Sequence, residues 1–350
     1  GECRDMHEME LEHAERIAAL VAENAALRLI AEDYRKVLRH RAKQYHDEHQ
    51  PVLEAALLSK AGLSVTVLEA REKVGGRAYI WEKNGFTFDT GPAWYLMPEA
   101  FDQFFRLMGT TAEKELDLVA LDPAYKTIYE GQSDSVTIYK DLAKNLEVFE
   151  GIEKGAGASL QKYLDSAELV YNIATKYFLY TNFNSLKPFL KRDLLKHTGL
   201  FMSQLLNSLH KYAGAHVRDE RLRKILNFPA VFLGASPYNT PSMYHLMTHV
   251  DMNQGVYYPM GGFYKIIEAI ERVAKQHGTV VHTNAPVTEI VVGDDKQVRG
   301  VKVGDIFYEA DIVVGNADLA SVETKLLAPE HQSYPQSYWD KNQPGPSALL

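Results

Sequence analysis

The sequence predicts an α/β fold that begins with a helix and a strand, is interrupted by a mostly helical region, and then resumes. Residues 53–69, LEAALLSKAGLSVTVLE, have the pattern of a helix that ends at a glycine and leads into a β-branched strand. Residues 125–254 become helical after two short strand patterns. Residues 255–325 return to alternating helix and strand patterns, so the α/β region is split by an insertion.

The composition narrows the classes of function. The chain has 350 residues, 46% hydrophobic and 24% charged, which is ordinary for a globular protein. Its net charge of -8 disfavours nucleic acid as a partner, because binding the phosphate backbone requires a basic face. The only cysteine, Cys3, has no disulfide partner, which fits a reducing compartment. The first residues do not read as a secretory signal and no apolar run spans a bilayer, so we expect a cytoplasmic protein, either soluble or bound to a membrane surface.

Residues 9–47 predict one long helix, because they contain no Gly or Pro and are rich in Ala, Leu, Glu, Arg and Lys. Pro51 then ends it. A heptad pattern of core positions runs through it, at Ile17, Asn24, Ala31 and Leu38 and at Leu20, Leu27 and Tyr34. Two interpretations stay open: self-association through residues 9–47, or a lone amphipathic helix that lies on the body or stands apart.

Glu69 closes the strand SVTVLEA, the second strand of a predicted βαβ unit. In such units the acidic residue at this position accepts hydrogen bonds from the ribose hydroxyls of a dinucleotide. A solvated carboxylate at a strand end is the other interpretation, and the strand alone does not separate the two.

The middle region begins with strands at YKTIYEG and SVTIYKD and continues as helices rich in Tyr and Phe. Within residues 171–213 these helices carry the basic residues Lys187, Lys191, Arg192, Lys196 and His197. A basic amphipathic helix can lie in the headgroup layer of a membrane, with its apolar side down. It can also cap its own domain with solvated lysines.

The last third predicts a helix over GGFYKIIEAIERVAKQHG and strands at TVVHT and VTEIVVG. A hairpin and a buried strand follow over KQVRGVKVGDIFYEADIVVGNAD. These elements complete the α/β region that the helical insertion interrupts.

Five stretches in a fixed order resemble one family. They are AGLSVTVLEAREKVGGRAYIWEKNGFTFDTGP, GVYYPMGGFYKIIEAIERVAKQHG, APVTEI, ADIVVGNAD and PGPSALL. Through them, residues 53–350 resemble the carotenoid desaturases of the phytoene desaturase family, a branch of the flavin amine oxidase superfamily. The resemblance implies an FAD-binding Rossmann-like domain of the glutathione reductase type, interrupted by a substrate and membrane domain. The implied parts are a helical extension (1–51), an FAD-binding part (52–124), the substrate and membrane domain (125–254), a second FAD-binding part (255–325) and a C-terminal substrate region (326–350).

The resemblance also implies which residues contact the ligands. The flavin contacts are Glu69, Ala70, Arg71, Gly75, Gly76, Arg77, Asp89, Gly91, Pro92, Val287 (on a strand, by its main chain) and Asn316. Glycines there let the backbone approach a ligand, and an arginine can pair with a pyrophosphate. The passage between flavin and substrate is implied to be lined by Tyr258, Pro259, Met260, Gly261 and Gly262. Taken alone, FDTGP would be an ordinary loop and YYPMGG a turn before a helix.

The implied function is FAD-dependent desaturation of a carotenoid precursor such as phytoene. A polyene offers no heteroatom to an acid or base, so the flavin takes a hydride while the protein orients and desolvates the substrate. Such a substrate would come from a membrane, which favours membrane docking through residues 171–213. No catalytic residue is singled out, and His245 and His249 fit a helix face better than a metal site. Alternatives are another flavoprotein of the superfamily (carotene isomerase, retinol saturase or amine oxidase) and a flavin-free interaction protein assembled through residues 9–47.

The sequence departs from the family before residue 52. Counting back from AALLSKAG, the glycines of the family's GxGxxG loop would fall at His46, Glu48 and Pro51, and the first strand would fall in the charged stretch VLRHRAKQY. The chain also stops at PGPSALL, before the family's closing segment. We therefore expect a truncated family member with residues 1–51 replaced by unrelated sequence. Its flavin binding is expected to be weak, because backbone donors to the pyrophosphate are lost.

Overall fold

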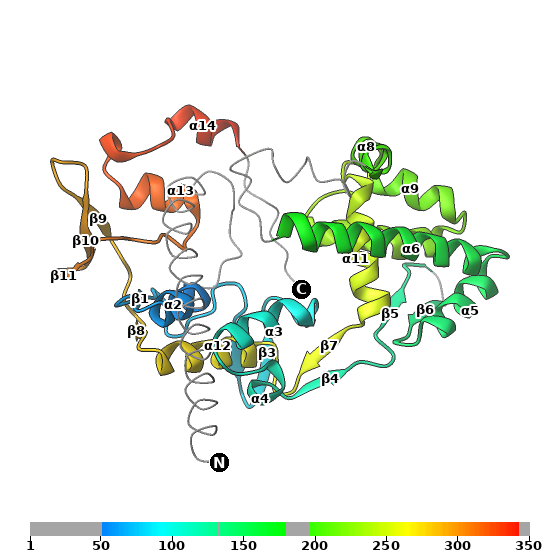
Figure 1. Cartoon of the computed structure of the whole chain (residues 1–350), viewed down its shortest axis with the longest axis horizontal. Coiled ribbons are helices and arrows are strands. Elements are labelled where there is room, and N and C mark those ends of the chain that lie inside the picture. The colour runs from blue at the N-terminus through cyan, green and yellow to red at the C-terminus, as the bar shows by residue number, and fades with distance from the viewer. Residues whose placement is uncertain (1–50, 132–133, 180–195, 343–350) are drawn as a thin grey trace, which may run out of the picture. The chain divides into compact units, whose positions relative to one another are not determined.

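The computed structural model describes residues 51–131, 134–179 and 196–342 (Figure 1). Within these ranges the chain divides into two units. Unit 1 contains the residues up to Gly91, Phe104–Thr111 and the residues from Tyr264 onward, and unit 2 contains Pro92–Gln103 and Ala112–Phe263. Several expectations lie outside the described residues: the long helix at 9–47 and its self-association, the positions His46 and Glu48, the basic residues Lys187, Lys191 and Arg192, and the segment PGPSALL.

Unit 1 opens with the predicted helix. Helix α2 (Pro51–Lys60) ends in a Schellman motif, in which Leu63 N–H donates to Leu58 O (3.1 Å) and Gly62 N–H donates to Ser59 O (2.9 Å). Gly62, the residue after the C-cap Ala61, has a φ of 86°, the left-handed conformation that this motif requires there. The helix-then-glycine pattern of the sequence is confirmed.

A parallel pair of strands follows. Strand β1 (Thr66–Leu68) pairs with β8 (Val280–His282). Helix α12 (Tyr264–Gln276) leads into β8 and packs against α2 (Figure 1). The buried residues of α12 recur at three and four spacing, as the sequence predicts: Tyr264, Ile266, Ile267, Ala269, Ile270, Val273 and Ala274. These four elements form the α/β part of unit 1.

A β-hairpin lies between the loop that follows β1 and the FDTGP segment. Strands β2 (Ile80–Lys83) and β3 (Phe86–Asp89) are antiparallel. Asn84 and Gly85 join them with positive φ values of 53° and 81°. Positive φ at both central residues is the type I′ turn, whose twist matches that of the strands.

The last part of unit 1 contains a three-stranded antiparallel sheet, β9 (Glu289–Val292), β10 (Val298–Val303) and β11 (Ile306–Glu309), with β10 in the centre. The predicted hairpin is confirmed, but the predicted buried strand over residues 310–318 is wrong. Those residues form no strand, and Ile312 is 48% exposed. A buried parallel strand needs ladder partners, and among the described strands β1 and β8 pair only with each other. Short helical segments complete the unit: α13 (Leu319–Ser321), η6 (Val322–Leu326), η7 (Pro329–His331) and α14 (Gln336–Lys341).

Unit 2 contains two small antiparallel sheets. Strand β4 (Leu118–Ala120) pairs with β7 (Tyr257–Pro259), and β5 (Tyr125–Ile128) pairs with β6 (Ser135–Ile138). The last two strands lie where the sequence predicts them. Helices α3 (Pro98–Leu107), which unit 1 shares from Phe104 onward, and α4 (Ala112–Glu115) precede β4.

The rest of unit 2 is helical, as predicted for the middle region. Its elements are α5 (Leu142–Ile152), α6 (Ala156–Ala174), η1 (Thr175–Leu179), α8 (Thr198–Leu206), α9 (Leu209–His216), α10 (Glu220–Asn227), η3 (Phe228–Leu233), η4 (Ser242–His245), α11 (Leu246–His249) and η5 (Val250–Gln254). Side-chain caps start three of them, from Asp141 on α5, Ser208 on α9 and Asp219 on α10. The core forms around α6, with Leu160, Tyr163 and Leu164 fully buried.

Candidate functional site

The loop after β1 holds the first candidate residue, Glu69. Its N–H donates to His282 O (2.9 Å), which extends the parallel ladder, and Ala285 N–H donates to Glu69 O (2.9 Å). The carboxylate accepts a 2.9 Å hydrogen bond at Oε1 from Arg71 N–H. Among the described residues Oε2 has no hydrogen-bond partner. The backbone of Glu69 is therefore fixed while one carboxylate oxygen remains available to a ligand hydroxyl.

Gly75 and Gly76 form a tight turn further along this loop. Their φ values of 125° and 56° lie where a residue with a side chain is strained. A Cβ at Gly75 would lie 2.5 Å from Ala78 O, whereas nothing lies within 4 Å of a Cβ added at Gly76. Arg71 Nη1 donates to Gly76 O (3.2 Å). The backbone of Gly76 therefore borders open space, held in place by Arg71.

The FDTGP segment packs directly on this turn. A Cβ at Gly91 would lie 2.0 Å from Arg77 O, so the two backbones are in contact and only glycine fits. Asp89, the last residue of β3, accepts a 3.4 Å hydrogen bond from Tyr264 N–H at the start of α12. The structure thus brings together the GGR and FDTGP segments that the sequence singled out.

Charged and aromatic side chains surround the turn. The Arg71 guanidinium lies 5.3 Å from the centre of the Tyr79 ring, and Tyr79 OH donates to Glu72 Oε1 (3.1 Å). Desolvation and the Glu72 carboxylate raise the pKa of Tyr79. Arg71 and Arg77 are both exposed, so the loop presents guanidinium groups suited to an anion.

The other candidate flavin contacts are less closely grouped. Ala70 is exposed beside Glu69, and Pro92 is the first residue of unit 2. Val287 was expected on a strand; it lies instead in the connection from β8 to β9, two residues before β9 begins. At the start of this connection, Asn284 N–H donates a hydrogen bond to Arg71 O (2.8 Å) in the loop after β1.

Asn316 lies between β11 and α13. Its side-chain Nδ2 is buried and finds no hydrogen-bond partner in the described part of the chain. A buried amide donor without a partner costs about 1–3 kcal/mol, so an unpaired one is unusual unless a ligand completes it. The open donor of Asn316 agrees with the cofactor contact that the resemblance implies.

The candidate substrate stretch, Tyr258 to Gly262, lies at the end of β7 in unit 2. Gly262 N–H donates to Pro259 O (3.1 Å) and Gly261 has a φ of 90°, which together make a tight turn with glycine at its third position. Met260 at the second position is 51% exposed. The local structure is thus a tight turn before a helix.

Asp251, in η5 just before β7, is the most perturbed carboxylate of unit 2. Tyr125 OH donates to Asp251 Oδ2 (2.6 Å), while Oδ1 is buried and has no partner among the described residues. Burial raises the pKa of Asp251 to about 7, although the Tyr125 hydrogen bond acts to lower it. Tyr125 also stacks on Trp94, with ring centroids 5.1 Å apart. A buried carboxyl that titrates near neutrality therefore lies close in sequence to the candidate substrate stretch.

His245 and His249 serve the packing of unit 2. His245 Nδ1 donates to Ser242 O (2.9 Å), so Nε2 is the acceptor for Ser166 Oγ–H (3.0 Å). Burial lowers the pKa of His245 to about 4. Across the described ranges, no group of His, Cys, Asp and Glu is arranged to hold a metal ion.

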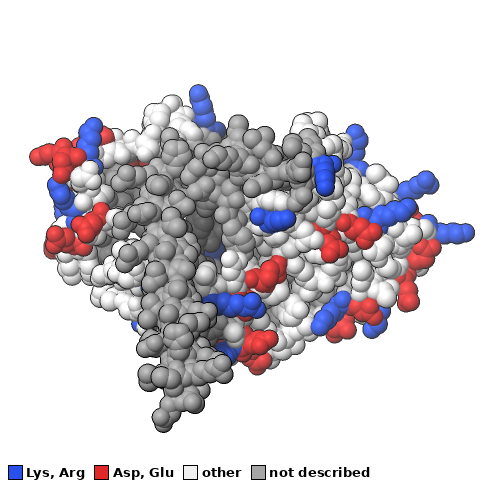
Figure 2. All heavy atoms as spheres, viewed as in Figure 1, with Lys and Arg blue, Asp and Glu red and all other residues white. Residues whose placement is uncertain are grey.

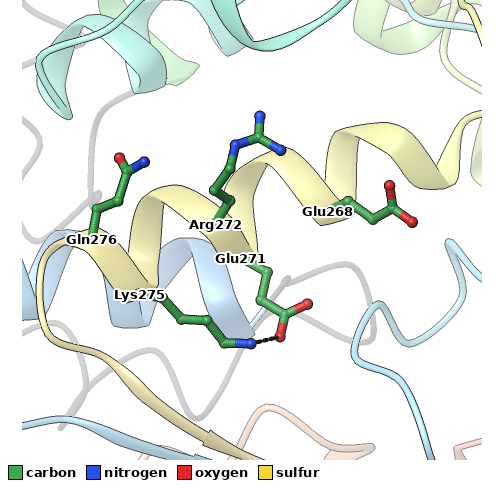
Figure 3. Close-up of a pocket in the computed structure, with 5 residues that line it drawn as sticks. All are labelled: Glu268, Glu271, Arg272, Lys275 and Gln276. Carbon is green, nitrogen blue, oxygen red and sulfur yellow. Dashed lines mark ion pairs between the residues drawn. The ribbon is translucent and has the colours of Figure 1, made fainter.

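A pocket of 510 Å³ lies on α12 but contains none of the candidate residues. Its lining is Glu268, Glu271, Arg272, Lys275 and Gln276, and Figure 3 shows these side chains along the one helix. Lys275 Nζ pairs with Glu271 Oε1 (2.6 Å). On the face drawn in Figure 2, acidic and basic side chains of the described residues are interspersed. Neither the pocket nor this face presents converging groups of one charge.

The sequence analysis missed Tyr264, which contacts the glycine turn, and Tyr79, which packs on Tyr264. Tyr264 OH donates to Val74 O (2.8 Å), and the Tyr79 ring meets the Tyr264 ring edge-on. No motif spacing marks either residue, because the Tyr264 contact joins segments 190 residues apart.

Residues 55–344 match the family model of the flavin containing amine oxidoreductases. The chain belongs to this family. The matched range contains every candidate flavin and substrate residue from Glu69 to Asn316. Proteins of this family contain a flavin, which agrees with the FAD that the sequence resemblance implies.

Curated relatives of this family member include carotenoid desaturases. The chain is 34% identical over 296 residues to the carotenoid 3,4-desaturase of Haloarcula japonica. This alignment covers 85% of this chain and 59% of the relative. The chain is also 34% identical over 277 residues to the zeta-carotene-forming phytoene desaturase of Myxococcus xanthus, covering 79% of this chain and 53% of the relative. The resemblance to the desaturases is confirmed, and the chain spans little more than half the length of these relatives.

A solved structure agrees with the fold. A double mutant of putrescine oxidase superposes with a TM-score of 0.50 at 16% identity, over 82% of this chain and 59% of the other. At this identity the likeness concerns the fold alone. It confirms the expected mixed α/β fold of a flavin oxidoreductase at that coarse level.

The described residues fit part of an FAD site. Glu69 Oε2 and Asn316 Nδ2 lack protein partners among the described residues, and the space in front of Gly76 is open. A carboxylate, an amide donor and bare backbone are the groups that a ribose and a pyrophosphate require. From the sequence we expect the family's glycine loop to be absent from residues 46–51. Of these positions only Pro51, which starts α2, lies in the described ranges.

Proposed function

We propose that this protein acts in the FAD-dependent desaturation of a carotenoid precursor such as phytoene. The observation that carries this proposal is the 34% identity to a carotenoid 3,4-desaturase over 85% of the chain. When bound, FAD supplies the hydride acceptor for removal of two hydrogens from adjacent sp3 carbons. The protein binds the cofactor, orients the polyene and excludes water.

The geometry of the loop after β1 and of the FDTGP segment supports the proposed cofactor contacts. Glu69 accepts from a ribose hydroxyl at Oε2, and Gly76 lets the pyrophosphate approach the backbone. Arg71 and Arg77 neutralise its charge, and Asn316 Nδ2 donates to the cofactor. The remaining contacts are main-chain atoms of the turns and connections that hold these groups, at Ala70, Gly75, Asp89, Gly91, Pro92 and Val287.

The polyene passage is proposed at Tyr258, Pro259, Met260, Gly261 and Gly262. The exposed Met260 and the bare backbone of Gly261 support this, because a flat polyene needs apolar contact without bulky side chains.

Access to such a substrate suggests a peripheral membrane protein, and we propose α8 as a docking element. Met202, Leu205 and Leu206 are 50%, 49% and 79% exposed on this helix, just after Lys196 and His197. Among the described helices, none has the length and apolar character to cross a bilayer. Leu206→Glu should reduce co-sedimentation with anionic liposomes. A matched change at an equally exposed strand residue, Ile128→Glu, should not; equal losses would contradict α8 as the docking element.

The decisive test of cofactor binding is the visible absorption spectrum of the purified chain, with and without added FAD. A bound-flavin band, followed by turnover of phytoene in liposomes, would support the proposal. A flavin band with turnover of an amine or a retinoid would favour another activity of the superfamily.

A colourless protein would contradict flavin binding by this chain. If it also forms a concentration-dependent oligomer that is lost on deletion of residues 1–47, the flavin-free interaction protein becomes the better account. An oligomer unaffected by that deletion would count against that account.

A further inference from the structure

Tyr264, the first residue of α12, contacts both segments that line the proposed flavin site. It is 5% exposed. Its hydroxyl donates a 2.8 Å hydrogen bond to Val74 O, the carbonyl that precedes Gly75. Its backbone N–H donates to Asp89 Oδ1 at 3.4 Å. One residue therefore links the glycine turn to the end of β3.

The ring of Tyr264 also limits where the glycine turn can lie. A Cβ at Gly75 would lie 3.1 Å from Tyr264 Cε2 and 3.3 Å from Ile267 Cγ2, so Gly75 packs on the first turn of α12. The Tyr79 ring meets the Tyr264 ring edge-on, with centroids 6.2 Å apart. A movement of the Tyr264 ring would therefore shift the turn that carries Gly76.

The hydroxyl is a constant donor. Burial raises the pKa of the Tyr264 phenol, and Glu271 and Glu268 raise it further, so the group keeps its proton throughout the physiological range. If the hydroxyl is removed, the carbonyl of the buried Val74 loses this hydrogen bond.

We propose that Tyr264 is a positioning residue for the flavin site, holding the Gly75–Gly76 turn and the Asp89 segment at the separation that the cofactor needs. It acts through the backbone and does not contact the cofactor. The inference rests on the proposed function, because it takes FAD as the ligand of these segments.

The test compares Tyr264→Phe with Tyr129→Phe, which deletes the same atom in unit 2. Tyr129 is also 5% exposed, and its hydroxyl also donates to a backbone carbonyl, Arg221 O (3.0 Å). Hydrogen exchange of peptides covering residues 70–80 and 86–92 is measured without FAD, and FAD affinity is measured by fluorescence titration. Tyr264→Phe should speed exchange in the peptide of residues 70–80, which loses the hydrogen bond to Val74 O, and weaken FAD binding by about tenfold. The peptide of residues 86–92 should change less, because the backbone N–H of residue 264 still donates to Asp89. Tyr129→Phe should leave exchange and FAD binding unchanged.

Unchanged exchange in Tyr264→Phe would overturn the inference, and so would equal effects in the two variants, which would mean general destabilisation. If the parent chain binds no FAD, the proposed function fails separately. The exchange measurement then still decides whether Tyr264 fixes the two segments.

Discussion

Replacing Asp251 with Asn should stabilise the chain at neutral pH. Burial raises the carboxyl pKa from the ordinary 3.8 to about 7. The folded state therefore keeps its proton over a range in which the unfolded state has lost it, and stability falls as the pH rises through that range. About three pH units at roughly 1.36 kcal/mol each give a loss of about 4 kcal/mol by pH 7. The amide of the variant can still accept from Tyr125 OH but carries no charge, so this loss disappears.

Urea unfolding followed by circular dichroism, repeated between about pH 5 and 8, measures the effect. The gain of Asp251→Asn over the parent should grow with pH, from about 2 kcal/mol at the acid end to about 4 kcal/mol at neutrality. Asp305→Asn, in the exposed turn between β10 and β11, is the control and should show no such growth. A gain that is independent of pH, or that the control reproduces, would refute the account of Asp251 as a buried carboxyl.

Three further outcomes are expected. Gly91→Ala should lower the unfolding free energy by about 1–3 kcal/mol in urea titrations, because its Cβ meets a backbone oxygen at 2.0 Å. Gly151→Ala, with nothing within 4 Å on helix α5, should not lower it, and equal losses would contradict the close packing. Gly76→Ala should lower the unfolding free energy by about 1–2 kcal/mol, because the backbone has a positive φ. In a fluorescence titration it should weaken FAD binding by more than that, because the new methyl group enters the open space proposed for the cofactor. A loss of binding free energy no larger than the loss of stability would remove Gly76 from the site. In the Asp251→Asn background, the unfolding free energy should rise with pH between about 4 and 6.5. Burial lowers the pKa of His245 to about 4, so in this range the unfolded state binds a proton that the folded state does not. A flat profile would mean that His245 is not buried as described.

Local patterns predicted much of the fold. The strand patterns YKTIYEG and SVTIYKD correspond to β5 and β6, and the apolar spacing in GGFYKIIEAIERVAKQHG corresponds to α12. Such elements depend on side-chain periodicity and turn residues within one segment, which the sequence displays directly. The same holds for the glycine that ends α2.

Features that depend on distant partners could not be predicted. The apolar run ADIVVGNAD has the composition of a strand, yet residues 310–318 form none, because no described strand offers them a ladder. The contact of Tyr264 with Val74 could not be predicted either, because the two residues are 190 positions apart and no local pattern near one indicates the other. Motifs thus indicated the candidate residues, while the contacts of Tyr264 with the glycine turn were found only in the structure.

The pairing of β1 with β8 has a consequence for how the chain is made. Thr66 meets Val280, about 210 residues later, so closing this pair costs roughly 5 kcal/mol of chain entropy. At about 5–20 residues per second, a ribosome needs about 10–40 s to reach β8 after completing β1. During that interval β1 has no strand to pair with among the described residues, while the helices of unit 2 emerge and can pack. The Glu69 loop, which needs both strands, is therefore expected to be among the last parts of the nascent chain to take shape.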